Sequence, residues 1–144
     1  LLHPEVEELL ALLNEDPALQ VHVETNGSVD LRWWKKQFPW VSFVVDFKLP
    51  ESGEMEKMDR GNFRVVDKRD VYKFVIASRQ DLEYAAWLVQ EEQLCQRTAV
   101  HFSPVLGKVD PAEIVEYMKE KGLSDVKLQM QIHKLIWKPD QRGV

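Results

Sequence analysis

The chain has 144 residues, of which 44% are hydrophobic and 30% charged, a composition typical of one soluble globular domain. Its net charge of −5, without a basic block, disfavours a surface that neutralises nucleic-acid phosphates. No apolar run approaches the roughly 18 residues that a membrane span needs, and the single cysteine excludes a disulfide framework or an iron–sulfur cluster held by three or four cysteines of this chain.

The first half of the chain reads as a helix followed by strands. Residues 4–14 carry apolar side chains at helical spacing, and residues 19–25 alternate as a strand does. A short helix is predicted over residues 33–38. Residues 41–47 are almost continuously β-branched or aromatic, which predicts a strand buried on both faces. Residues 51–62 form a polar loop with at most one helical turn.

The second half repeats a strand–helix unit. Strands are predicted at residues 71–77 and 99–103, each followed by a helix. Ser78 caps the first of these helices, and Asp81 takes the place of the reciprocal carboxylate in a capping box. Asp110 caps the second. Such alternation predicts an α/β fold with a parallel sheet and crossover helices, in one domain over residues 1–144.

The last strand, predicted over residues 126–133, carries an unusual polar face. Period-two alternation sends one set of side chains to the core and the other to the opposite face. The core set is Val126, Leu128, Met130 and Ile132, and the polar set is Lys127, Gln129, Gln131 and His133. This polar set is costly in a sheet unless solvent or a polar ligand meets it, so a solvated edge strand is the alternative.

Polar residues gather where the predicted strands end. Parallel α/β folds bind ligands at the carboxyl ends of their strands. The residues at these ends are Thr25, Asn26, Asp46, Lys48, Ser103, Gln131 and His133. Asp46 and Lys48 are two apart and share a face, so together they suit the zwitterionic end of an amino acid. A structural ion pair is the alternative, as is a simple turn at Asn26.

Three other residues suggest structural roles. His22 and His101 lie inside predicted strands and are interpreted as packed histidines rather than ligands. Cys95 is interpreted as structural because no activating neighbour is evident. The sequence contains no phosphate-binding glycine loop, nucleophile elbow or zinc-ligand spacing.

Five motifs in order resemble one family over nearly the whole chain. They are Val23-Glu-Thr-Asn-Gly27, Val45-Asp-Phe-Lys-Leu-Pro50, Lys73-Phe-Val75, Phe102-Ser-Pro104 and Leu128-Gln-Met-Gln-Ile-His133, and the tail from Trp137 to Val144 agrees with them. The chain resembles the C-terminal portion of the 7-carboxy-7-deazaguanine synthases, which are radical S-adenosylmethionine enzymes. The first two motifs occur across radical S-adenosylmethionine activases, whereas the Gln-x-His motif points to the deazaguanine branch.

The resemblance implies a partial (β/α) barrel of the radical S-adenosylmethionine type, with its N-terminal strands missing. The cluster-binding cysteines and the Gly-Gly-Glu-Pro motif of the family would precede Leu1, and the absence of an initiator methionine agrees with a truncated start. This chain alone would then be inactive and unable to bind the cluster. No signal peptide is evident, and a cytoplasmic location is expected.

Site residues follow from the resemblance position by position. Those implied for S-adenosylmethionine are Thr25, Asn26, Asp46, Lys48, Ser52, Ser103 and Pro104. Those implied for the pterin substrate, 6-carboxy-5,6,7,8-tetrahydropterin, are Gln131, His133 and the terminal carboxylate of Val144. The implied chemistry is reductive cleavage of S-adenosylmethionine by a [4Fe–4S] cluster, followed by ring contraction of the substrate. Magnesium assists in this family, with no ligand assigned here, and flavodoxin or ferredoxin supplies the electron.

Two alternatives stay open at this point. One is an activase of a glycyl-radical enzyme, which would accept a protein loop in place of the pterin. The other is a non-catalytic ligand-binding module, although residues 19–25 lack the lysine or proline that protects an exposed edge strand. We also expect a homodimer, with Trp33, Trp34 and Trp40 forming its surface.

Overall fold

The computed structural model describes residues 1–132 and 136–137. These residues contain a five-stranded parallel sheet. The strands are β1 (His22–Thr25), β2 (Ser42–Phe47), β3 (Val71–Ile76), β4 (Ala99–Pro104) and β5 (Val126–Leu128). They lie side by side in chain order, β1-β2-β3-β4-β5, and every neighbouring pair is parallel. The predicted α/β fold with a parallel sheet and crossover helices is therefore confirmed.

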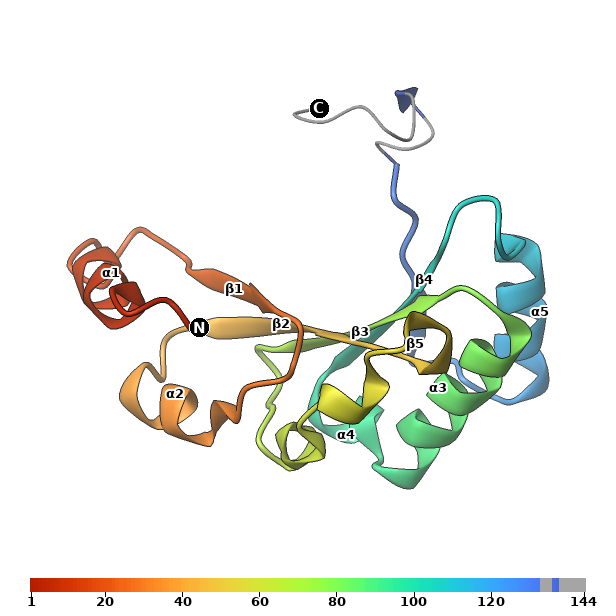
Figure 1. The fold of residues 1–144 in the computed structure, drawn as a ribbon, viewed down its shortest axis with the longest axis horizontal. Helices are drawn as coiled ribbons and strands as arrows, with labels where there is room; N and C mark the ends of the chain where they lie inside the picture. Colours follow the sequence, from red (N-terminus) through yellow and green to blue (C-terminus); the bar gives the residue numbers. More distant parts are fainter. Residues whose placement is uncertain (133–135, 138–144) are drawn as a thin grey trace.

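The helices lie mainly on one side of this sheet. They are α1 (Val6–Leu13), α2 (Leu31–Gln37), α3 (Arg79–Glu91), α4 (Leu94–Arg97) and α5 (Pro111–Glu120), with short 3-10 turns η1 (Pro50–Ser52), η2 (Met55–Lys57) and η3 (Arg60–Arg64) between β2 and β3. Right-handed crossovers that always step in the same direction place their connections on one face. Figure 1 shows α2, α3 and α4 below the sheet and the segment after β5 rising on the other side. We call these sides the helical face and the open face.

Aromatic side chains form the core on the helical face. Phe47 packs against Phe63 and Phe74 with ring centroids 5.2 and 5.7 Å apart, and Tyr72 lies 5.0 Å from Phe63. The alternate residues of β2, Val44 and Asp46, are only half-buried because they point to the open face. The prediction that this strand is buried on both faces was therefore wrong.

The two predicted helix caps, Ser78 and Asp110, are present, but Asp81 does not complete a capping box. The hydroxyl of Ser78 accepts a hydrogen bond from the backbone N–H of Asp81, and Asp110 accepts one from Ala112. The carboxylate of Asp81, however, does not reach back to the N–H of Ser78 as a capping box requires. It accepts from the N–H groups of Ala77 and Glu51, so it ties two loops together.

The last strand is shorter than predicted, because β5 ends at Leu128 and not at residue 133. The ladder continues only to the hydrogen bond from Gln129 N to the carbonyl of Phe102. In parallel pairing the next donor toward β5 would be the nitrogen of Pro104, which carries no hydrogen. The pairing stops there, and Ile132 is 62% exposed instead of entering the core.

Tyr72 offers a test of the core. Its hydroxyl is buried and has no hydrogen-bond partner among the described residues, and burial holds the pKa of this phenol well above its usual value. A buried unsatisfied hydroxyl is destabilising. We expect Tyr72→Phe to raise the free energy of unfolding by about 1 kcal/mol, measured by urea denaturation. Tyr84→Phe, which removes a hydroxyl bonded to Arg60, should give no such gain.

The tryptophan cluster is only partly available to a partner. Trp34 is 8% exposed and packs in the core, so it cannot form part of a dimer surface as predicted. Trp33 packs edge-on against Trp34 with ring centroids 4.9 Å apart and remains 45% exposed. The homodimer itself stays a prediction. Among the helices of the described ranges, none combines the length and apolar character required to span a bilayer.

Candidate ligand site at the carboxyl ends of the strands

A row of charged and polar side chains crosses the open face through the middle of β3 and β4 and meets β2 one residue before its carboxyl end. The register pairs Asp46 of β2 with Lys73 of β3, Lys73 with His101 of β4, and His101 with Lys127 of β5. Partners in such a row lie about 5 Å apart and point to the same side. Parallel sheets are normally covered on both faces, so a row of this kind marks a surface suited to a polar ligand or to more protein.

The strongest sign of a ligand is a set of buried oxygens without partners. Within the described residues, Asp46 Oδ1, Ser103 Oγ and Gln131 Oε1 are buried and accept no hydrogen bond. Buried polar atoms are almost always satisfied, so each of these three oxygens is a candidate acceptor for a ligand. All three residues were predicted from the sequence to line a site. Each stands near or just beyond the carboxyl end of its strand.

Asp46 and Lys48 form the predicted pair. Lys48 Nζ lies 2.8 Å from Asp46 Oδ2, and both side chains are about one-third exposed, at 32% and 30%. The pair occupies only one carboxylate oxygen, which leaves Oδ1 for another donor. An ion pair with an unused buried acceptor fits a ligand that brings its own ammonium group.

The loop after β1 is a tight turn held by its own side chains. Asn26 Oδ1 accepts from the N–H and the hydroxyl of Ser28, and Thr25 Oγ1 accepts from the N–H of Gly27. Gly27 has φ +77°, and a Cβ there would lie 2.9 Å from Val45 Cγ1, so only glycine fits. Thr25 pairs with the core residue Val45, so the pleat directs its side chain to the helical face. Asn26 follows the end of β1 and is exposed.

The loop after β2 closes a small hollow at the same edge. Ser52 donates its hydroxyl to the carbonyl of Leu49, and Asp81 anchors the N–H of Glu51 at 3.0 Å. A cavity of about 190 Å³ lies between Lys48, Ser52, Asp81 and the start of the loop after β4. Ser52 and Lys48 line the same cavity, and the role of Ser52 in binding stays a prediction.

The remaining predicted site residues divide into two groups. Pro104 is buried at the end of β4, next to Ser103. His133 and Val144 lie outside the described residues, so their roles stay predictions.

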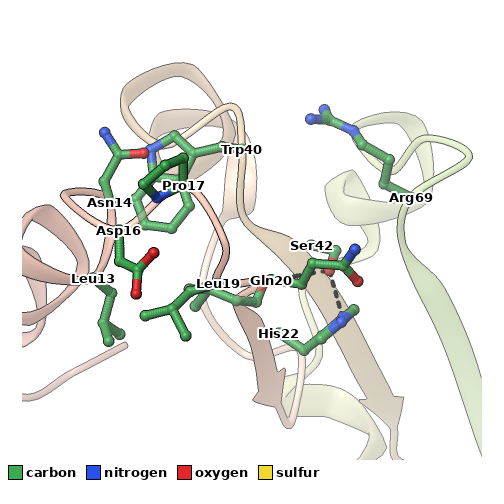
Figure 2. A pocket seen from close by; sticks show the side chains of 11 residues that line it. Leu13, Asn14, Asp16, Pro17, Leu19, Gln20, His22, Trp40, Ser42 and Arg69 are labelled. Carbon is green, nitrogen blue, oxygen red and sulfur yellow. Dashed lines mark hydrogen bonds between the residues drawn. The ribbon is translucent and has the colours of Figure 1, made fainter.

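The two histidines of the strands differ from each other. His22 is exposed on the edge strand β1 and was wrongly interpreted as packed. Its Nδ1 lies 2.7 Å from Ser42 Oγ, beside a cavity of about 590 Å³ at the amino ends of β1 and β2 (Figure 2). That cavity is at the edge opposite to the candidate site. Its lining includes Trp40 and Arg69.

His101 is half-buried in the open-face row. Its pKa is held below the usual value mainly because burial disfavours the charged form, and the ammonium groups of Lys127 and Lys73 act in the same direction. The imidazole is therefore neutral near pH 7 and can both donate and accept a hydrogen bond.

The sequence did not lead us to predict Lys73 as an open-face residue, and it led us to interpret His101 as a packed histidine. A signal was available, because Tyr72, Phe74 and Ile76 alternate with Val71, Lys73 and Val75 in β3. A lysine at the centre of an otherwise apolar strand has to point away from the core. Only the register shows that it stands between Asp46 and His101.

The described residues contain no group of three or more His, Cys, Asp or Glu side chains that could hold a metal ion. Cys95 is half-buried, and burial raises the pKa of its thiol, which disfavours the thiolate that an iron–sulfur cluster needs. The donor set on the open face suits an ammonium, a carboxylate and hydroxyl groups.

Comparison with known proteins identifies relatives along the full length of the chain. Proteins named 7-carboxy-7-deazaguanine synthase match it from Clostridium acetobutylicum, at 44% identity over 144 residues, and from Chlorobaculum tepidum, at 33% over 139 residues. The protein of the same name from Leptospira interrogans is 35% identical over 126 residues. These matches cover 100%, 94% and 85% of this chain but 65%, 60% and 50% of the relatives. No protein-family model and no solved structure matches the chain.

Proposed function

Because this chain belongs to the family of the 7-carboxy-7-deazaguanine synthases, we propose that it is the carboxyl-terminal part of such an enzyme. The complete enzyme would convert 6-carboxy-5,6,7,8-tetrahydropterin into 7-carboxy-7-deazaguanine in queuosine and deazapurine biosynthesis. The chain spans at most about two-thirds of the relatives it matches, so the cluster-binding part would come from the rest of the protein. The observation that carries the proposal is the set of unsatisfied oxygens of Asp46, Ser103 and Gln131.

Asp46 and Lys48 would hold the amino-acid end of S-adenosylmethionine. The free Oδ1 of Asp46 accepts from an ammonium group, and Lys48 faces the carboxylate. Ser103 Oγ then takes a hydroxyl or ring nitrogen of the nucleoside, with Ser52, Pro104 and Asn26 at the rim. When bound beside a [4Fe–4S] cluster, S-adenosylmethionine supplies the radical chemistry, whereas these side chains supply position and charge.

Gln131 would bind the planar pterin. A carboxamide presents a donor and an acceptor in one plane, which matches the hydrogen-bonding edge of such a ring. Its Oε1 is buried and unsatisfied in the described part of the chain, so it is ready to accept a ring N–H. His133 and the carboxylate of Val144 complete this group in the proposal. The neutral imidazole of His101 and the ammonium of Lys73 lie on the same face.

The proposed parent fold is a partial (β/α) barrel of the radical S-adenosylmethionine type. Parallel strands in strict chain order, with helices on one face, are the arrangement that such a barrel requires. β1 forms one edge of the sheet, and further parallel strands of the parent would pair with it. The magnesium site and the contact with a flavodoxin- or ferredoxin-type donor are assigned to that other part.

The test is an anaerobic assay of the full-length protein with S-adenosylmethionine, 6-carboxytetrahydropterin and a chemical reductant. We expect 7-carboxy-7-deazaguanine to form only when all components are present. Gln131→Ala and His133→Ala should each weaken pterin binding about tenfold while leaving S-adenosylmethionine binding within about twofold. Absence of the product, or equal loss of both ligands in both variants, would contradict the proposed roles.

A further inference from the structure

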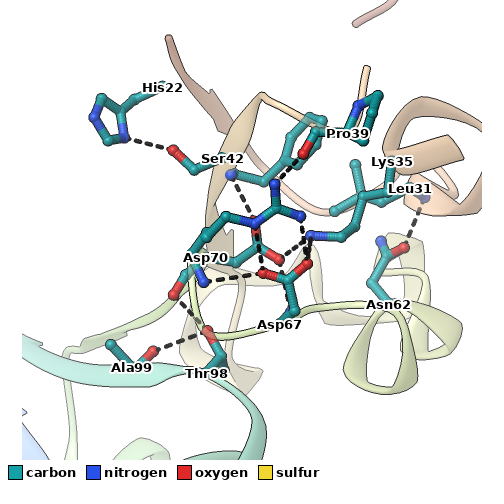
Figure 3. A network of polar contacts seen from close by, with 12 residues as sticks. His22, Leu31, Lys35, Pro39, Ser42, Asn62, Asp67, Asp70, Thr98 and Ala99 are labelled. Atoms are coloured by element: carbon teal, nitrogen blue, oxygen red, sulfur yellow. Dashed lines mark hydrogen bonds and ion pairs between the residues drawn. The ribbon is translucent and has the colours of Figure 1, made fainter. Parts of the chain in front are cut away.

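The side chain of Asn62 joins two loops that are far apart in the sequence. Asn62 lies in η3 between β2 and β3 and is fully buried. Its Oδ1 accepts from the N–H of Leu31 at 2.8 Å, as drawn in Figure 3. Its Nδ2 donates to the carbonyls of Val29 at 2.9 Å and Gly27 at 3.3 Å. One carboxamide therefore spans the whole connection from the end of β1 to the start of α2.

Apart from the local bonds of Thr25 and Asn26 within the turn, this connection is held by residues 59–62. The N–H of Leu31 is in the first turn of α2, where the helix itself provides no acceptor. The N–H of Asp59 also donates to the carbonyl of Gly27, at 2.9 Å, so the loop is held from outside by residues 59–62. Gly27 meanwhile lies so close to Val45 that no Cβ fits. The loop is thus pressed against β2 on one side and held by Asn62 on the other.

Only an amide of this length suits the position. An aspartate of the same size would keep the acceptor for Leu31, but it would place a buried carboxylate against two carbonyl oxygens. Alanine would leave the N–H of Leu31 and the carbonyl of Val29 without their partner, whereas the carbonyl of Gly27 would keep the N–H of Asp59. Either change loosens or displaces the turn that carries Asn26, without touching the open face directly.

We propose that Asn62 is a positioning residue, which holds the Thr25–Asn26–Gly27 turn where S-adenosylmethionine binds. This inference rests on the proposed function, because that function assigns the turn to the S-adenosylmethionine site. Affinity falls in proportion to the fraction of molecules whose binding loop is correctly placed. A turn that occupies its place one-tenth of the time binds about tenfold more weakly.

The experiment uses the full-length protein and compares Asn62→Asp and Asn62→Ala with Thr98→Val. Thr98 is a matched control, because its buried hydroxyl bonds the carbonyl of Asp70 far from the turn. We expect both Asn62 variants to speed amide exchange over residues 27–31 and to raise the Kd for S-adenosylmethionine about tenfold. The Kd for the pterin should stay within about twofold, and Thr98→Val should change neither ligand's affinity.

Two further outcomes separate the inference from the proposed function. Asn26→Ala tests the turn directly and should weaken S-adenosylmethionine binding. If it does so while the Asn62 variants speed exchange but bind normally, the positioning role is overturned and the proposed function stands. If Asn26→Ala and Asp46→Asn both bind normally, the proposed site fails and the inference fails with it. Unchanged exchange in the Asn62 variants would also overturn it. Asn62→Ser replaces any variant that does not fold.

Discussion

Replacing Asp46 by asparagine should weaken the binding of S-adenosylmethionine by about 10- to 100-fold. A hydrogen bond to a charged group contributes about 1.5–3 kcal/mol, and its loss gives a change of this size. In the present structure Asp46 Oδ2 is paired with Lys48 and Oδ1 is buried without a donor. An amide in its place loses the charge that an ammonium group requires and can turn its NH₂ toward that group. Equilibrium dialysis or calorimetry on the full-length protein measures the effect.

A matched control removes an equal charge at the other end of the sheet. Asp125 directly precedes β5 at its amino end and is exposed, so Asp125→Asn should leave the affinity unchanged within about twofold. Lys48→Met should weaken binding as Asp46→Asn does, because the ligand's carboxylate loses its partner. Normal affinity in Asp46→Asn would show that the pair is only a structural ion pair, which the sequence alone left open.

Replacing Asp70 by alanine should lower the free energy of unfolding by about 3–5 kcal/mol. The Asp70 side chain is fully buried, and it accepts from the N–H groups of Phe43 at 2.9 Å and Asp67 at 2.8 Å. It also pairs with the ammonium of Lys35, which is itself only 11% exposed (Figure 3). Removing the carboxylate leaves the N–H groups of Phe43 and Asp67 without their acceptor, and Lys35 keeps only the half-exposed carboxylate of Asp67 as a partner. Urea denaturation followed by circular dichroism measures the change.

An exposed ion pair provides the comparison for Asp70. Arg79 and Glu83 are one helical turn apart in α3, with side chains 49% and 55% exposed. Glu83→Ala should cost no more than about 0.5 kcal/mol, since solvent screens such pairs. A similarly small loss in Asp70→Ala would mean that water or other groups replace the lost partners, and that Asp70 does not tie α2 to the sheet.

Local patterns in the sequence were enough to determine the order and kind of most elements. Helical spacing and cap residues predicted α3 and α5, because Ser78 and Asp110 satisfy donors only a few residues away. The short helix α2 begins at Leu31, two residues before its predicted start, because Asp30 caps it by bonding the N–H of Arg32. The four-residue helix α4 was not predicted, since it is too short for any periodicity to show.

The candidate site was predicted only in outline. The sequence indicated that polar residues collect at the ends of parallel strands, and Asp46, Ser103 and Gln131 do have unsatisfied buried oxygens within the described residues. The rule that partner strands end at one edge is general and needs no structure. The contribution of Lys73 and His101 depends on register, which alternation within a single strand does not reveal.

By itself, the sequence determined the α/β class, the parallel sheet and the family, because these depend on local periodicity and on motifs read along the chain. Only the tertiary structure decided where β5 stops, which side chains share the open face, and which buried groups connect distant loops. Pro104 ends the pairing of β5 by lacking a donor toward a strand more than twenty residues away. Asn62, Asp70 and Asp81 bond backbone groups about thirty residues distant. Such contacts form only when distant segments come together in the folded chain, so no local sequence pattern predicts them.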